Sequence, residues 1–428
     1  MMHNNFFMGV TVKVKLHRSY LRVEAPQKHS LTHKDTGPRD TGTQRRHLHP
    51  HISDDSAMGH LPAKPLLQGT TVKRGEDITF VWHDSGVEDY RWKKNGYILV
   101  NGGRISIRRD GAYFYLTIRA AKEEDEGEYT LEVSNSKGTV SGSAKVTVLE
   151  YDRDWRNAQW GANDLIKQLL ANYTLSNPNV THLRFLLHGR VGVGKSSIIN
   201  TINCTFQGRV NVKALAAAGS HTSFTKCYET HMIMDKGGAQ LPFVFNDIMG
   251  LENQERSWAL TDDIISALKG HVKEKYKFNP VTPLCEGDCS YNSRPTLDDK
   301  VHCLVSVIRA DRIGLLDTGD VVLEKMRMVR EAASNLDIPQ VVFLTFVDEC
   351  CPVVKKDLKR IYSSKMIKQA MQDCSNKLGV PMNCIYPVKN YSEEIEVNDE
   401  VDCLILDALH NAVNFANDFV RDKSNMSS

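Results

Sequence analysis

The stretch LRFLLHGRVGVGKSSIINTIN, residues 183–203, decides the fold of the larger part of this chain. Its first residues form an apolar run that is typical of a buried strand, and SSIINTIN begins a helix. Between the two, residues 189–196 read G-x-x-x-x-G-K-S, the pattern of a phosphate-binding loop. Glycines let successive backbone amides point inward at phosphate oxygens, and the following helix adds the positive end of its dipole. The stretch therefore predicts a strand-loop-helix unit that binds a nucleotide.

Further apolar, β-branched runs follow this unit, with helical stretches between several of them. They are LPFVFND (241–247), VHCLVSVIRA (301–310), QVVFLTFVD (340–348) and NCIYPVKNY (383–391). Alternation of strands and helices is typical of a mostly parallel sheet with helices on both faces. We therefore expect an α/β P-loop GTPase-like domain over 183–420, followed by a short tail at 421–428.

The loop and the next strand supply the predicted phosphate and metal ligands. Lys195 would reach the β and γ phosphates, and the Ser196 hydroxyl would bind Mg²⁺. Asp247, which ends the strand LPFVFND, would hold Mg²⁺ through water, and the amide of Gly250 would sense a γ-phosphate. Within the loop and the first helical turn, the nucleotide-binding residues are predicted to be Gly189, Arg190, Val191, Gly192, Val193, Gly194, Lys195, Ser196 and Ser197.

The choice of base is expected at the end of a later strand, Leu344 to Asp348. The GTPase pattern there is N-K-x-D, whose aspartate accepts two hydrogen bonds from guanine. Asp348 matches the aspartate, whereas Thr345 and Phe346 replace the asparagine and the lysine. We predict guanine over adenine on Asp348, and Phe346 is either a ring that stacks on a purine or an ordinary core residue. Lys389 stands in the place of a fifth motif near the base, with a surface charge as the alternative.

Residues 61–150 have a different sequence pattern. Short alternating runs separated by turn signals predict a β-sandwich. These residues resemble the intermediate-set (I-set) immunoglobulin modules: Trp92 stands at the core tryptophan position, and Asp125 to Tyr129 match the D-x-G-x-Y corner. Trp82 and Leu131 occupy the two disulfide positions, which fits a domain that folds where disulfides do not persist. Because such frameworks carry no chemistry, we expect this domain to bind a protein partner.

Two segments lie outside these domains. Residues 1–60 are basic, rich in histidine and without periodicity, so we expect a disordered tail. Residues 151–182 are expected to be a helical connector, with Trp160, Leu165, Leu169 and Leu170 on one side of an amphipathic helix.

Composition excludes several classes of protein. The 54 Lys and Arg residues nearly cancel the 52 Asp and Glu residues, so we expect no nucleic-acid partner bound through bulk charge. No apolar run approaches the ~20 residues that cross a bilayer, so we expect no transmembrane segment. The ten cysteines follow neither a zinc-ligand nor a disulfide pattern. We therefore expect these cysteines to be reduced thiols in a cytoplasmic protein.

The stretch from about 183 to 420 resembles the interferon-induced protein 44 family. The resemblance rests on GRVGVGKSSIINTIN, LPFVFNDIMGLE, DDIISALKGHV, DDKVHCLVSVI, LTFVDE and YPVKNYSEE. It implies a core similar to dynamin-like and septin-like GTPases, binding of GTP or GDP with Mg²⁺, a cytoplasmic location, and induction in the antiviral innate immune response. The family's T-x-x-Y pattern implies Thr225 as the switch I ligand of Mg²⁺, with Thr222 as the alternative. Related GTPases pair across the nucleotide face, which implies a homodimer.

Two hypotheses about activity follow from the residue after D-x-x-G. Small GTPases place a glutamine there to orient water, whereas this chain has Leu251, which cannot hold water by a hydrogen bond. The first hypothesis is a guanine-nucleotide switch that hydrolyses GTP slowly or only with a partner. The second is a non-catalytic scaffold in which the immunoglobulin-like domain binds a protein and the nucleotide site is structural or degenerate. No catalytic residue is assigned under either hypothesis.

Overall fold

The computed structural model describes residues 60–211, 227–252, 258–279, 281–317 and 319–425. These form two compact units that divide between Val148 and Leu149, each with its own hydrophobic core. The expected tail at 1–60 lies outside the described residues except for His60. In the part of the chain that is described, no helix is both long and apolar enough to cross a membrane.

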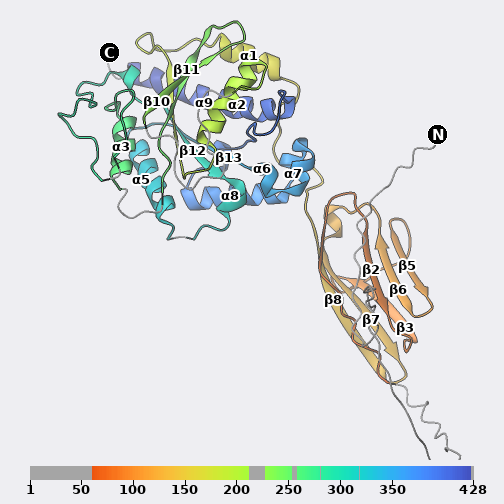
Figure 1. Cartoon of the computed structure of the whole chain (residues 1–428). Helices are drawn as coiled ribbons and strands as arrows, with labels where there is room; N and C mark the ends of the chain where they lie inside the picture. The colour runs from red at the N-terminus through yellow and green to blue at the C-terminus, as the bar shows by residue number, and fades with distance from the viewer. Residues whose placement is uncertain (1–59, 212–226, 253–257, 280, 318, 426–428) are drawn as a thin grey trace, which may run out of the picture. The chain divides into compact units, whose positions relative to one another are not determined.

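The first unit is a β-sandwich (Figure 1), so the immunoglobulin-like prediction is confirmed. One sheet has the strand order β1-β8-β7-β3-β4 and the other has the order β2-β6-β5. The strands are β1 (Thr70–Val72), β2 (Ile78–His83), β3 (Asp89–Lys94), β4 (Tyr97–Ile98), β5 (Ile105–Asp110), β6 (Tyr113–Ile118), β7 (Gly127–Asn135) and β8 (Gly138–Val148).

The core of the sandwich contains the residues that the sequence singled out. Trp92 on β3 is buried, and its ring centroid lies 5.7 Å from that of Phe80. The Tyr129 hydroxyl donates a 2.8 Å hydrogen bond to the main-chain oxygen of Asp125, which closes the tyrosine corner. Trp82 and Leu131 are both buried in this core, where apolar contact replaces a disulfide.

The second unit is an α/β domain built on a six-stranded sheet of order β10-β11-β9-β12-β13-β14. Strands β9 and β11 to β14 are parallel, as expected, but β10 is antiparallel to β11, so the sheet is mixed. The strands are β9 (Leu183–His188), β10 (Glu229–Met234), β11 (Gln240–Asp247), β12 (Cys303–Arg309), β13 (Gln340–Thr345) and β14 (Ile385–Pro387).

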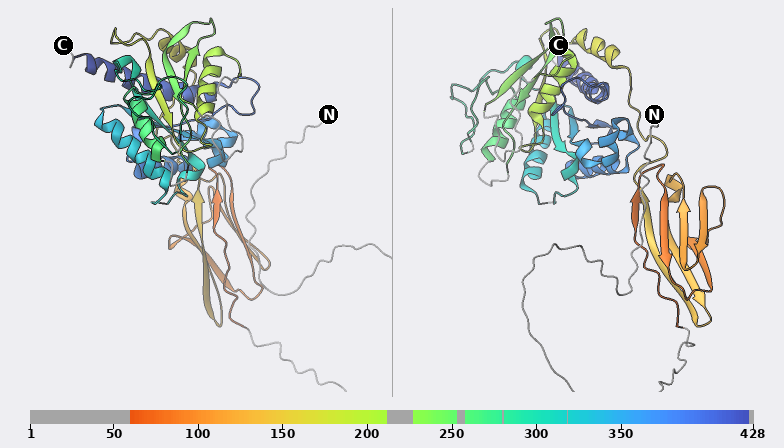
Figure 2. Two further views of the ribbon diagram at one scale, coloured as in Figure 1. Left: turned by 60° about the vertical axis from the view of Figure 1, so that its left-hand side comes forward. Right: turned by 45° about the vertical axis from the view of Figure 1, so that its right-hand side comes forward.

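Helices lie on both faces of this sheet. Helix α9 contacts both α1 and α2 on one side, and α3, α5 and α8 form a chain of contacts on the other (Figures 1 and 2). The helices are α1 (Asn163–Ala171), α2 (Lys195–Gln207), α3 (Trp258–Leu268), α4 (Ala310–Ile313), α5 (Val321–Asn335), α6 (Val347–Cys350), α7 (Pro352–Lys356), α8 (Lys365–Leu378) and α9 (Asp399–Asn425).

The segment 151–182 is part of the second unit, because α1 packs on α9. The expected buried side of α1 was partly wrong. Ile166 and Leu170 are buried, whereas the side chains of Leu165 and Leu169 are 59% and 49% exposed. At the other end of the chain, α9 continues to Asn425 and so runs into the segment expected as a tail.

Candidate nucleotide-binding site

The candidate site lies at the carboxyl edge of the parallel strands, where the strand order reverses. From β9 the chain moves to β11 on one side of the sheet and later returns to β12 on the other side of β9. Such a reversal leaves a crevice outside the strand ends, and ligands of open α/β sheets bind there. Residues 189–196, here called the glycine loop, leave β9 at this point and lead into α2.

The backbone of the glycine loop requires glycine at particular positions. Gly189 has φ of 150°, and a Cβ atom at this residue would collide with the main-chain oxygen of Val307 on β12. Gly194 has φ of 94° immediately before α2 begins. Side chains are strained in these conformations, so the glycines of the motif are explained by the path of the chain. The loop thus presents its backbone at the amino end of a helix of 13 residues.

Lys195, the first residue of α2, is buried at the centre of the loop. Its Nζ lies 3.3 Å from the main-chain oxygens of both Gly189 and Arg190, and donates a hydrogen bond to each. Burial lowers the pKa of the Lys195 ammonium, and the nearby Asp247 carboxylate opposes this change. A buried ammonium whose described hydrogen-bond acceptors are two neutral loop carbonyls attracts an anion strongly.

Ser196 and Asp247, the two predicted metal ligands that the structure describes, are brought together from different elements. The Ser196 hydroxyl at the start of α2 donates a 2.5 Å hydrogen bond to Oδ2 of Asp247, the buried last residue of β11. A hydroxyl and a carboxylate oxygen are the donors that Mg²⁺ prefers in phosphate sites, so this pair fits the metal. Thr225 and its alternative Thr222 lie outside the described residues.

The segment after Asp247 is fastened to the glycine loop by its backbone. The amide of Leu251 donates to the main-chain oxygen of Gly189 at 3.0 Å, and the amide of Val191 donates to the oxygen of Leu251 at 3.2 Å. Gly250 packs so closely on Val191 that an added Cβ would lie 2.7–2.9 Å from its atoms. The Leu251 side chain is buried. The segment therefore supports the glycine loop through backbone hydrogen bonds and apolar packing. The side chain of Leu251 has no polar group.

Thr345, which replaces the asparagine of N-K-x-D, has a role that the sequence did not reveal. The side chain is buried at the end of β13, and its hydroxyl lies 2.8 Å from the main-chain oxygen of Val193 and 3.0 Å from that of Ile308. Asn390, after β14, donates to the main-chain oxygen of Gly194 at 3.3 Å. These two polar side chains clamp the glycine loop from the carboxyl ends of β13 and β14.

This clamp leads to a stability prediction. Thr345→Val keeps the side-chain volume but leaves the buried oxygens of Val193 and Ile308 without this donor, so we expect a loss of about 1–2 kcal/mol in the free energy of unfolding. Thermal and urea unfolding of the second unit would measure it. Thr345→Ser retains the hydroxyl and is the control; equal losses in both variants would mean that packing, not the hydrogen bond, is responsible.

Arg190 and Lys389 are held by partners of their own, and Asp348 lies on the short helix α6. Arg190 Nη2 contacts the Asp320 carboxylate at 2.7 and 2.5 Å. Asp348 is half-buried in the first turn of α6. Lys389 Nζ lies 2.5 Å from Oε1 of Glu394. Lys389 is therefore engaged within its own loop.

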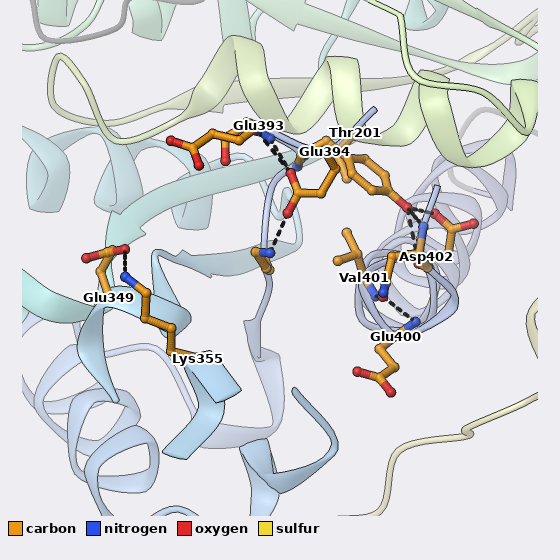
Figure 3. Close-up of polar contacts among 12 residues, drawn as sticks. Thr201, Glu349, Lys355, Glu393, Glu394, Glu400, Val401 and Asp402 are labelled. Atoms are coloured by element: carbon orange, nitrogen blue, oxygen red, sulfur yellow. Dashed lines mark hydrogen bonds and ion pairs between the residues drawn. The ribbon is translucent and has the colours of Figure 1, made fainter. Parts of the chain in front are cut away.

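The loop after β14 is tied down around Glu394 (Figure 3). Its Oε2 accepts hydrogen bonds from the amides of Ser392 and Glu393 at 2.8 and 3.2 Å. Burial opposes ionisation of Glu394, but the hydrogen bonds from Lys389 and Ser392 outweigh it and bring the pKa to about 2. The Tyr391 hydroxyl in turn donates to Asp402 at 2.8 Å. The loop is thus held at both ends, which fixes the wall that it contributes to the site.

A cavity of about 940 Å³ opens beside the glycine loop. Of the predicted residues, Arg190, Val191, Gly192, Val193 and Ser197 line it. Sequence reasoning missed other lining residues, among them Arg309, Arg312 and Tyr391. Arg309 directly ends the apolar run of β12, so a polar residue at the carboxyl end of a parallel strand was the signal that could have found it.

Comparison with known proteins finds two kinds of relative for this chain. Residues 63–148 match the immunoglobulin I-set domain model. Human interferon-induced protein 44 is 33% identical over 266 residues, which cover 61% of this chain and 59% of that protein. The chain is similar to interferon-induced protein 44. Human interferon-induced protein 44-like is also 33% identical, over 57% of this chain and 53% of that protein.

These matches confirm the two resemblances drawn from the sequence. The chain spans less than two thirds of the length of the interferon-induced protein 44 relatives. Among solved structures, the titin M3 domain is 29% identical and covers 21% of this chain and 96% of its own length, with a TM-score of 0.20.

Proposed function

We propose that the second unit is a P-loop GTPase-like domain that binds a guanine nucleotide with Mg²⁺, in a protein of the interferon-induced 44 type. Similarity to interferon-induced protein 44 supports an interferon-induced role, which we place in the cytoplasmic antiviral response. The observation that carries the nucleotide proposal is the meeting of Lys195, Ser196 and Asp247 at the glycine loop, beside a cavity of about 940 Å³. An anion-binding backbone, a buried ammonium and a pair of metal-binding oxygens have one common ligand class, a nucleotide polyphosphate.

Each residue has a part in binding. The amides of the loop and of the amino end of α2 donate hydrogen bonds to the phosphate oxygens, and Lys195 exchanges the oxygens of Gly189 and Arg190 for phosphate oxygens. Ser196 and Asp247 hold Mg²⁺, which neutralises phosphate charge when bound. Asp348 accepts hydrogen bonds from guanine, and a switch I threonine, Thr225, completes the metal site. Hydrogen bonds between charged partners are strong enough to dominate the affinity.

Hydrolysis by this arrangement is weak or depends on a partner. The side chain of Leu251 is buried and apolar, and its backbone amide already donates a hydrogen bond to the main-chain oxygen of Gly189. Neither group can therefore orient a water molecule. Arg190 forms an ion pair with the Asp320 carboxylate, so its positive charge is already balanced. Stabilisation of the transferred phosphate would then need a group from a partner, and a second copy of the chain that pairs across the nucleotide face would be one source.

The test is a titration of the purified chain with fluorescent GDP, GTP and ATP, with and without Mg²⁺. We expect magnesium-dependent binding of GTP and GDP, and weaker binding of ATP. Binding of none of the three nucleotides would overturn the proposal, and equal binding of ATP would overturn the guanine assignment.

A second candidate function rests on the edge of the immunoglobulin-like unit. Tyr97, Ile98 and Val100, on and just after the edge strand β4, are 81%, 59% and 75% exposed. Exposed apolar side chains on a sheet edge favour a protein partner, so the chain is alternatively a non-catalytic scaffold. Under that function, a variant that cannot bind nucleotide would keep its cellular activity, whereas Tyr97→Asp would lose it.

A further inference from the structure

Phe346 and Arg309 form a flat stack beside the glycine loop. The Arg309 guanidinium carbon lies 3.6 Å from the centroid of the Phe346 ring. Asp311 holds the guanidinium in place through two 2.9 Å hydrogen bonds, from Nε to Oδ1 and from Nη2 to Oδ2. A guanidinium is planar by itself, and the two hydrogen bonds fix its orientation, so the ring and the cation form one rigid unit.

The backbone of Phe346 is strained in a way that places this ring. Its φ is 56°, and among the described non-glycine residues with positive φ it is the one aromatic. Bulky residues avoid this conformation, and when they adopt it the position is commonly functional. The preceding residue, Thr345, is bonded to the oxygen of Val193 in the glycine loop. The strained turn therefore sets the ring at a defined position relative to the loop.

The stack borders the space that a nucleotide would enter. Phe346 and Arg309 line the cavity together with Gly192 and Val193, and Phe346 Cε2 lies 3.8 Å from the Cβ position of Gly194. Phe346 is half-buried, so part of the residue remains exposed. A base attached to phosphates in the glycine loop would enter a cavity that has this stack in its wall.

We propose that the Phe346–Arg309 stack is the platform against which the nucleotide base lies. The inference rests on the proposed nucleotide function. It adds that one group provides affinity for the base and that another selects guanine. Every base has a π face, so stacking provides affinity without selecting among purines. Selection of guanine is then left to the carboxylate of Asp348, while Asp311 is a positioning residue that keeps Arg309 flat on the ring.

The experiment compares Phe346→Leu with Phe346→Tyr in the full chain, because leucine keeps apolar volume but has no flat ring. Binding of GTP, of ATP and of inorganic tripolyphosphate is measured by calorimetry. We expect Phe346→Leu to weaken GTP and ATP alike by about 10-fold or more, as loss of a base–aromatic stack does. Tripolyphosphate has no base, so its affinity should be unchanged, and Phe346→Tyr should bind all three as the original chain does.

Other outcomes separate this inference from the proposed function. If GTP binds the original chain and Phe346→Leu equally, the platform is wrong and the nucleotide function stands. If Phe346→Leu weakens tripolyphosphate as much as GTP, the ring supports only the shape of the loop, and the platform is again wrong. If the original chain binds neither nucleotide nor tripolyphosphate, the proposed function fails and the platform fails with it.

Discussion

Lys195→Ala is expected to abolish nucleotide binding, with at least a ~100-fold loss of affinity for GTP, GDP and tripolyphosphate. The ammonium is buried at the centre of the glycine loop, where its only described hydrogen-bond acceptors are the oxygens of Gly189 and Arg190. Removing one partner of a buried charge pair costs about 3–5 kcal/mol, which is roughly a 100-fold to 4,000-fold change in binding. Calorimetric titration with each ligand would measure the loss.

The same substitution should leave the fold intact. Burial lowers the pKa of Lys195, so the folded chain bears a desolvation cost for the charged form that alanine removes. The melting temperature of the second unit without ligand should therefore stay the same or rise. Lys269→Ala, an exposed lysine that does not line the cavity, makes the same change in net charge and should bind nucleotide normally. Nucleotide binding by Lys195→Ala at the original affinity would contradict the site.

Trp92→Ala is expected to destabilise the immunoglobulin-like unit by about 3–5 kcal/mol. The indole is buried against Phe80 in the centre of the sandwich, and no disulfide supports this core, because all ten cysteines are described in the second unit and all are free. A small domain of marginal stability would lose most of its free energy of unfolding. In calorimetry of the full chain, the first unit's transition should fall by more than about 10 °C or disappear.

The two cores make this a selective test. Because each unit has its own hydrophobic cluster, the transition of the second unit should not move in Trp92→Ala, and added GTP with Mg²⁺ should raise only that transition. Tyr97→Ala, at an exposed position of the same unit, is the control and should change little. A drop in both transitions would mean that the units unfold together and would contradict their independence.

Local patterns in the sequence were sufficient for much of the architecture. The strands of the sandwich, the tyrosine corner at Tyr129 and the parallel strands β9 and β11 to β14 all follow from periodicity and turn residues close in sequence. The antiparallel strand β10 was not expected, because this strand at the sheet edge is mostly half-buried and so has little buried periodicity. The prediction of the buried face of α1 was wrong at Leu165 and Leu169, because only the position of α9 decides which face of that helix is covered.

The candidate site shows the same division between local and long-range information. The sequence by itself determined the glycine loop, Lys195 and Ser196, because a tight phosphate-binding turn needs particular residues at fixed spacing. It also indicated Asp247, at the end of a recognisable strand. Only the tertiary structure decided that Thr345 clamps the loop and that Arg309 stacks on Phe346. Such contacts join residues tens to more than a hundred positions apart, and only the order of strands in the sheet brings them together.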